Sequence, residues 1–169
     1  WLAPFICFTA EEAWLARFPG ESESVHLRLF PDIPADWQDD ELAAKWSKIR
    51  ELRRVVTGAL EIERAEKRIG SSLQSHPVVH TTQAYLDVMS GVDAAEITIT
   101  SDITLTADPA PTDAFAIEDV AGVSVVCALA DGEKCERCYK FLPDVGAEAV
   151  SSDLCGRCLD AIKFHPAMD

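Results

Sequence analysis

Four cysteines arranged in two pairs are the residues of this chain whose types and spacing could do chemistry. Cys135 and Cys138 form one Cys-x-x-Cys pair, and Cys155 and Cys158 form a second pair that sixteen residues separate from the first. Two residues between cysteines let a tight knuckle point both sulfurs at one ion, and a returning second pair completes a tetrahedron. The spacing predicts one structural Zn²⁺, because four thiolates leave no open position for water or substrate.

Other arrangements of these cysteines are less consistent with the pattern. Two disulfides would suit an oxidising compartment, but paired Cys-x-x-Cys spacing is typical of metal ribbons. His165 is close enough in sequence to replace a ligand, although four cysteines already complete the shell. Cys7 and Cys127 lie in apolar stretches, so we interpret them as packing residues.

Positive charge is concentrated in two parts of an acidic chain. The 169 residues carry a formal net charge of −14, and residues 69–133 contain no lysine or arginine. Residues 45–68, in contrast, hold eight basic and four acidic side chains. A phosphate-binding surface can therefore form only on residues 45–68 and around the cysteine knuckles.

The basic segment is predicted to be one long helix. Apolar residues recur mostly at three- and four-residue steps from Leu42 to Ile69, including Trp46, and acids near Asp36–Asp40 suit a helix N-terminus. We expect the helix to end at Gly70 after about thirty residues. The side opposite the apolar stripe is expected to carry eight cations: Lys45, Lys48, Arg50, Arg53, Arg54, Arg64, Lys67 and Arg68. Such a face is usually only solvated, so the helix alone does not indicate RNA binding.

Shorter elements are expected on either side of this helix. A capping box at Thr9–Glu12 predicts a short first helix, and residues 24–31 are expected to be an extended connector. Strands are expected at 78–80, 96–100 and 122–130, with a short helix at 83–89. The prediction is an α+β fold with a helical region over residues 1–70, a small α/β subdomain over 71–130 and a zinc-binding module over 131–169.

The sequence contains no recognisable catalytic centre. It lacks a glycine-rich phosphate loop, a Gly-x-Ser-x-Gly elbow and a metalloprotease helix, and the acids of residues 69–133 are scattered singly. It also has no apolar run long enough to cross a membrane and no signal-peptide pattern. We therefore expect a non-catalytic, cytoplasmic segment, and the apolar start without methionine indicates part of a larger protein.

Several stretches resemble, in order, the class I aminoacyl-tRNA synthetases. Trp1–Pro4 with Phe8–Trp14 resembles the late helix of the anticodon-binding bundle in that family, and Ser24–Leu27 fits the connector after it. Glu63–Leu73 is similar to a helix end of bacterial isoleucyl-tRNA synthetases, and the four-cysteine tail resembles their zinc-binding C-terminal module. The chain departs from the family at Tyr139, where a tryptophan is usual, which puts a tryptophan-specific stacking role in doubt.

The resemblance implies a C-terminal part of an isoleucine–tRNA ligase. The signatures of the catalytic domain are absent, so the fragment should be inactive alone, and ATP would act only in the missing part of the enzyme. Its partners would be the anticodon stem-loop of tRNA-Ile and the rest of the synthetase. Residues 1–70 would then be the end of the helical anticodon-binding domain with its connecting helix. The candidate tRNA contacts are Arg137, Tyr139, Lys140 and Arg157 on the knuckles, and Lys45, Lys48, Arg53, Arg54, Arg64, Lys67 and Arg68, with Arg50, on the helix.

A rival interpretation comes from the charge of the chain. A zinc-ribbon module that binds another protein, and makes no tRNA contact, would suit the net charge of −14 and the acidic residues 69–133.

Overall fold

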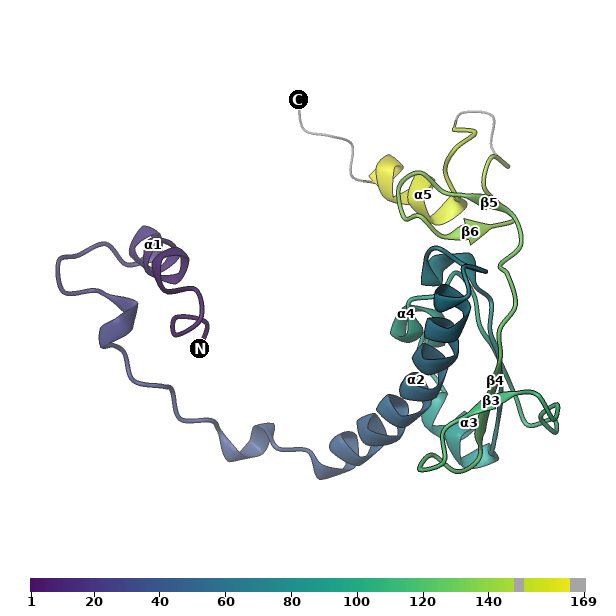
Figure 1. Ribbon diagram of the computed structural model, residues 1–169. Coiled ribbons are helices and arrows are strands. Elements are labelled where there is room, and N and C mark those ends of the chain that lie inside the picture. The colour runs from purple at the N-terminus through teal and green to yellow at the C-terminus, as the bar shows by residue number, and fades with distance from the viewer. Residues whose placement is uncertain (148–150, 165–169) are drawn as a thin grey trace. The chain divides into compact units, whose positions relative to one another are not determined.

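The chain divides into two compact units, Trp1–Asp40 and Glu41–Asp169. The structure is a computed structural model that describes residues 1–147 and 151–164 (Figure 1). The division falls at the first residues of the long helix. The functional boundaries expected after residues 70 and 130 stay predictions.

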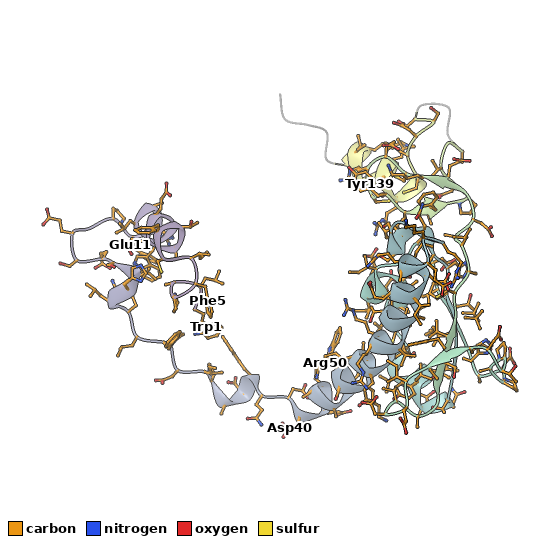
Figure 2. The ribbon with its side chains drawn as sticks, viewed as in Figure 1. Trp1, Phe5, Glu11, Asp40, Arg50 and Tyr139 are labelled. Atoms are coloured by element: carbon orange, nitrogen blue, oxygen red, sulfur yellow. The ribbon has the colours of Figure 1, made fainter. Side chains whose placement is uncertain are left out.

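The first unit is a short helix with a connector held against it. Helix α1 spans Cys7–Arg17, and single 3-10 turns follow at Val25–Leu27 (η1) and Ala35–Trp37 (η2). The predicted cap at Thr9 was wrong, because a turn at residues 2–6 already starts the helix and Ile6 is its N-cap. Glu11, labelled in Figure 2, instead accepts hydrogen bonds from Val25 N at 2.9 Å and Ser24 Oγ at 3.1 Å. The segment expected to be extended therefore contains a turn fixed by a carboxylate of α1.

Helix α2 is the long helix that the sequence predicted, and it spans Asp40–Ala65. Its apolar side is buried at Ile49, Leu52, Val55, Val56, Ala59 and Leu60. Leu42 and Trp46 were expected in the same stripe, but they are 49% and 37% exposed, because the start of α2 extends beyond the packed core. The helix also ends before Gly70: Lys67 adopts a left-handed conformation, and Arg68 N donates to the Glu63 carbonyl.

A four-stranded sheet provides the surface against which α2 packs (Figure 1). Its strands are β1 (Val78–Thr81), β2 (Thr104–Thr106), β3 (Phe115–Ala116) and β4 (Val123–Val126), in the order β2-β1-β4-β3. β1 pairs in parallel with β2, and the other pairs are antiparallel. Val79, Val123 and Val125 are buried in the same cluster as the apolar side of α2. The predicted strands at 78–80 and 122–130 are thus confirmed, the second in shortened form.

Two short helices connect the strands. Helix α3 spans Gln83–Met89, as predicted, whereas α4 spans Ala94–Thr98, where a strand was expected. The strand prediction was wrong because local side chains stabilise a helical turn instead. Asp93 accepts a hydrogen bond from Glu96 N at 3.0 Å, and Thr98 Oγ1 donates to the Ala94 carbonyl at 2.8 Å. Ile99 then ends α4 in the left-handed conformation.

The C-terminal part of the second unit is a small module that we call the knuckle module, residues 133–147 and 151–164. It contains a two-stranded ribbon, β5 (Glu133–Lys134) with β6 (Phe141–Leu142), and helix α5 (Gly156–Phe164). Gly132 leads into the ribbon with a φ of +95°, and a Cβ there would lie 2.2 Å from the Leu142 carbonyl carbon. This turn therefore requires glycine. Among the residues described, no helix combines the length and apolarity needed to span a bilayer.

Candidate metal centre and nucleic-acid interface

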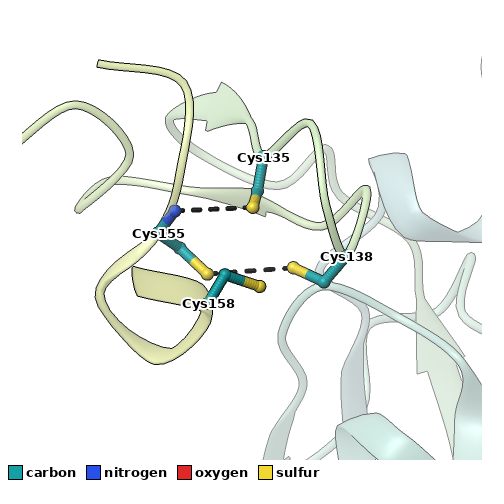
Figure 3. Close-up of side chains that lie close together, drawn as sticks. All are labelled: Cys135, Cys138, Cys155 and Cys158. Carbon is teal, nitrogen blue, oxygen red and sulfur yellow. Dashed lines mark hydrogen bonds between the residues drawn. The ribbon is translucent and has the colours of Figure 1, made fainter. Parts of the chain in front are cut away.

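The four cysteines of the two Cys-x-x-Cys pairs meet at one point of the knuckle module. Cys135 and Cys138 come from the turn after β5, and Cys155 and Cys158 from the start of α5 (Figure 3). Their sulfurs all lie within 4.8 Å of one another, and Cys135, Cys155 and Cys158 are buried. Tyr139 N donates to the Cys135 carbonyl at 2.8 Å and Leu159 N to the Cys155 carbonyl at 3.0 Å, so each knuckle is a closed backbone turn. The group could hold a metal ion.

The distances between the sulfurs fit a single tetrahedral ion. Four sulfurs at about 2.3 Å from one Zn²⁺ are about 3.8 Å apart along each edge of the tetrahedron. The Cys138 and Cys155 sulfurs are 3.8 Å apart. All six cysteines of the chain are free thiols in the structure. His165, considered above as a substitute ligand, lies outside the described residues.

Backbone N–H groups and burial shift the pKa values of the cysteine thiols in opposite directions. Burial alone would raise the pKa of Cys135, but the N–H groups of Cys138, Cys155 and Arg137 point at its sulfur and lower the pKa to about 6. The Cys155 N–H lies 3.4 Å from that sulfur. Burial raises the pKa of Cys155 itself to about 12. Four thiolates this close together need a positive counter-charge, which a divalent cation supplies.

Two of the knuckle candidates for RNA contact, Tyr139 and Arg137, are exposed. Tyr139 is 54% exposed, in a left-handed conformation, and the Lys134 ammonium lies 4.9 Å from its ring centroid (Figure 2). Arg137 is exposed and donates to Cys158 Sγ at 3.7 Å, which partly neutralises that sulfur. Tyr139 and Arg137 therefore offer a ring and a cation at the surface of the first knuckle.

Lys140 and Arg157 are both occupied by one carboxylate. Lys140 Nζ and Arg157 Nη1 each lie 3.0 Å from Glu96 Oε1 on α4. The hydrogen bond from Lys140, more than that from Arg157, holds the pKa of Glu96 below its usual range. The Lys140 side chain is only 14% exposed, whereas that of Arg157 is 66% exposed. Lys140 thus has little surface left for RNA.

The cations of α2 do not all lie on one face. Successive helical residues are about 100° apart, so Arg50, Arg53 and Arg64 lie within roughly 60° of one another, on the exposed side. Lys45 precedes the buried Ile49 by one turn and is itself half-buried, and Lys48 lies about 160° around the helix from Arg50. Neither lysine shares that side, contrary to the prediction.

Most arginines of α2 and its end already have protein partners. Arg53 Nε donates to the Ile97 carbonyl at 2.8 Å, and Arg54 pairs with Asp119 at 2.8 Å. Further pairs join Arg64 to Glu61, and Arg68 to Glu63 and Glu66. Within residues 1–147 and 151–164, no such partner is found for Lys45, Lys48, Arg50 and Lys67. These four are the helix candidates whose charge is not yet neutralised at close range.

Two residues that organise this region were not identified from the sequence. Glu96 lies in a segment expected to be a strand, and Ser101 accepts a hydrogen bond at 2.7 Å from the Phe141 backbone N–H of the ribbon. Ser101 is 4% exposed. A serine or glutamate in a polar stretch carries no local signal of such a role, because its partners in the knuckle module lie 40 or more residues away.

Comparison with known proteins finds similar sequences for the whole chain and for its first half. Residues 1–80 match the family model described as the anticodon-binding domain of tRNA ligase. The chain is 52% identical over 169 residues to the isoleucine–tRNA ligase of Agrobacterium fabrum and 51% identical to that of Brucella abortus, covering 99% of this chain in each case. It is 50% identical over 159 residues to the corresponding protein of Ruegeria pomeroyi, covering 94% of the chain. It spans only 16–17% of the length of these relatives.

The chain is therefore similar to tRNA ligases, and its residues 1–80 are similar to their anticodon-binding domain. Within that class it corresponds to the C-terminal region of isoleucine–tRNA ligase, which confirms the resemblance drawn from its motifs. The mixed helix-and-sheet fold and the clustering of the four cysteines are confirmed as well.

Proposed function

We propose that this chain holds the anticodon stem-loop of tRNA-Ile as part of an isoleucine–tRNA ligase, and that one zinc ion folds the module that meets the RNA. The observation that carries the proposal is the match of residues 1–80 to an anticodon-binding domain, within a similarity that covers 99% of the chain. The parent would use ATP to activate isoleucine in the cytoplasm, in a catalytic domain that these residues do not include.

The zinc ion would be structural. Cys135, Cys138, Cys155 and Cys158 would hold it as thiolates, and closed coordination supplies folding energy without an open site for chemistry. The spacing of the sulfurs and the buried position of three of them support this role. The chain's own residues then contribute shape: a backbone hydrogen bond closes each knuckle, and Tyr139 is exposed at the end of the first one.

RNA recognition would combine a stacking ring with exposed cations. Sequence-specific proteins usually read bases that are splayed out of RNA loops, by stacking and hydrogen bonding. Tyr139 is the exposed ring of the first knuckle and Arg137 the neighbouring cation. Arg50 and Lys67 would contact phosphates, since their charges lack close protein partners among the described residues. The acidic residues 69–133 would keep RNA off their own surface by repulsion.

Filter binding of the zinc-loaded chain to isoleucine tRNA and to an unrelated tRNA, across a salt series, tests the proposal. We expect salt-dependent binding that is tighter for isoleucine tRNA. Tyr139→Ala should weaken it by about 1–3 kcal/mol if the ring stacks on a base. Arg50→Ala should reduce the salt slope by about 1, whereas Arg54→Ala, on the same helix but paired with Asp119, should change it less.

The rival function predicts a different outcome. If the chain were a protein-binding zinc module, neither tRNA would bind in a salt-dependent way, and Tyr139→Ala would have no effect on RNA retention. That result would overturn the proposed tRNA contact while leaving the metal site untouched.

A further inference from the structure

One carboxylate of helix α4 contacts both metal knuckles. Glu96 Oε1 accepts from Lys140, two residues after the first cysteine pair, and from Arg157, between the cysteines of the second pair, each at 3.0 Å. We propose that Glu96 is a positioning residue that fixes the knuckle module against the helix-and-sheet core and thereby aims its RNA-binding side chains. This inference rests on the proposed function for its RNA part only.

The contact depends on the complete metal centre. Lys140 and Arg157 are 17 positions apart in sequence and belong to different knuckles, so one oxygen can reach both only when the two cysteine pairs are brought together. The small exposed fraction of Lys140, 14%, shows that this side chain is enclosed at the junction. Lys140 and Arg157 are thus better assigned to holding the module than to binding phosphates.

A second contact lies beside the first. Ser101 Oγ accepts the Phe141 N–H at 2.7 Å and donates to the Leu73 carbonyl, so a buried serine joins the ribbon strand β6 to the core. The Phe141 N–H lies one residue from Lys140. Its protection from solvent exchange therefore reports directly whether the module is docked.

Helix α4 is in turn fixed to α2. Arg53 Nε donates to the Ile97 carbonyl at 2.8 Å, close to the C-terminal end of α4, where a cation is favourable. Contacts thus run from α2 through Arg53 to α4, and from α4 through Glu96 to the knuckles. Through them the cations of α2 and the ring of Tyr139 would keep a fixed relative position.

The direction in which Glu96→Gln changes tRNA affinity distinguishes a positioning role from a simple effect of charge. Glu96 is negative, so if it only repelled RNA or masked two cations, Glu96→Gln would strengthen tRNA binding. If it positions the module, the same change should weaken binding, because the free module samples many orientations. Glu118→Gln is the matched control: it removes an equal charge from an exposed side chain that has no hydrogen-bond or ion-pair partner within residues 1–147 and 151–164.

The experiment measures amide exchange and tRNA affinity in the full, zinc-loaded chain. Glu96→Gln should speed exchange of the Phe141 N–H about tenfold, in line with the loss of two ion pairs at a partly covered site. The Cys135 N–H, which donates to the Lys140 carbonyl inside the module, should keep its protection. Affinity for isoleucine tRNA should fall by about threefold or more relative to Glu118→Gln.

Each other result contradicts a defined part of the inference. Unchanged Phe141 exchange in Glu96→Gln would overturn the positioning role. Faster exchange with equal or tighter tRNA binding would overturn the link between position and RNA. If the unsubstituted chain bound no tRNA at all, the proposed function would fail, and Phe141 exchange would still decide whether Glu96 holds the module.

Discussion

Removal of the metal should unfold the knuckle module and leave the helix-and-sheet core folded. The module contains two strands of two residues each and one nine-residue helix. Neither a two-stranded ribbon nor a helix of this length is stable by itself in water. Its buried cluster consists mainly of the cysteines, with Leu142, Val145 and Leu154 only partly buried around them. Thiolate–metal bonds must therefore supply most of its folding free energy.

The expected loss of folding free energy is much larger for the knuckle module than for the core. Structural zinc contributes on the order of 10 kcal/mol or more to a small module, which is comparable with the stability of a whole domain. The core loses far less, because the side-chain contacts that join it to the module are few. The hydrogen bond between Ser101 and Phe141 is worth about 1 kcal/mol, and the partly exposed pairs of Glu96 about 0–1 kcal/mol each. The core should thus lose roughly 1–3 kcal/mol.

The metal would be removed either by the substitution Cys135→Ser or by a chelator. Residue-resolved amide exchange and urea unfolding would then be measured. Protection of the Tyr139 and Leu159 amides, which close the knuckles, should disappear. The helical circular dichroism of the 26-residue α2 should persist with a slightly lower urea midpoint. Cys7→Ser makes the same chemical change at an exposed cysteine far from the cluster in sequence and should have neither effect. Knuckle amides that stay protected without metal would refute the reasoning.

Three further predictions concern the core. Burial, with a hydrogen bond to Glu51, raises the pKa of Tyr85 to about 12, so the free energy of unfolding should fall as the pH rises from about 10 to 12. Tyr85→Phe should remove a tyrosinate absorbance step near pH 12, and Tyr139→Phe should leave that step in place. Ile99→Asn should raise the urea-derived unfolding free energy by about 1 kcal/mol, because Ile99 is β-branched at φ +57°; no gain would mean that Ile99 packing offsets the strain. Burial raises the pKa of Cys127 to about 11, so peptide-mapped alkylation should modify it far more slowly than exposed Cys7, and equal rates would contradict its burial.

The metal cluster could be predicted from the sequence because coordination chemistry acts over short distances. Two residues between cysteines determine the knuckle, and a returning pair must complete the shell wherever the rest of the chain lies. Helix 83–89 and the buried stripe from Ile49 to Leu60 were also predictable, since both depend on local periodicity. The C-terminal end of α2 was not, because Lys67 adopts a backbone conformation usually reserved for glycine.

The segment from Glu96 to Thr100 shows why the rest could not be predicted. Its alternating β-branched residues favour a strand, but the Asp93 cap and the Thr98 hydrogen bond to Ala94 stabilise a helical turn. Once helical, the segment presents Glu96 to partners 44 and 61 residues away. Neither the pairing of Lys140 and Arg157 nor their loss as free RNA cations follows from local sequence.

Chemical footprinting of isoleucine tRNA bound to the zinc-loaded chain tests the central claim most directly, namely that a metal-folded module holds the anticodon. The expected result is protection of anticodon-loop bases that disappears when the metal is chelated, while α2 stays helical. Protection that survives chelation, or that falls only on the acceptor stem, would contradict it.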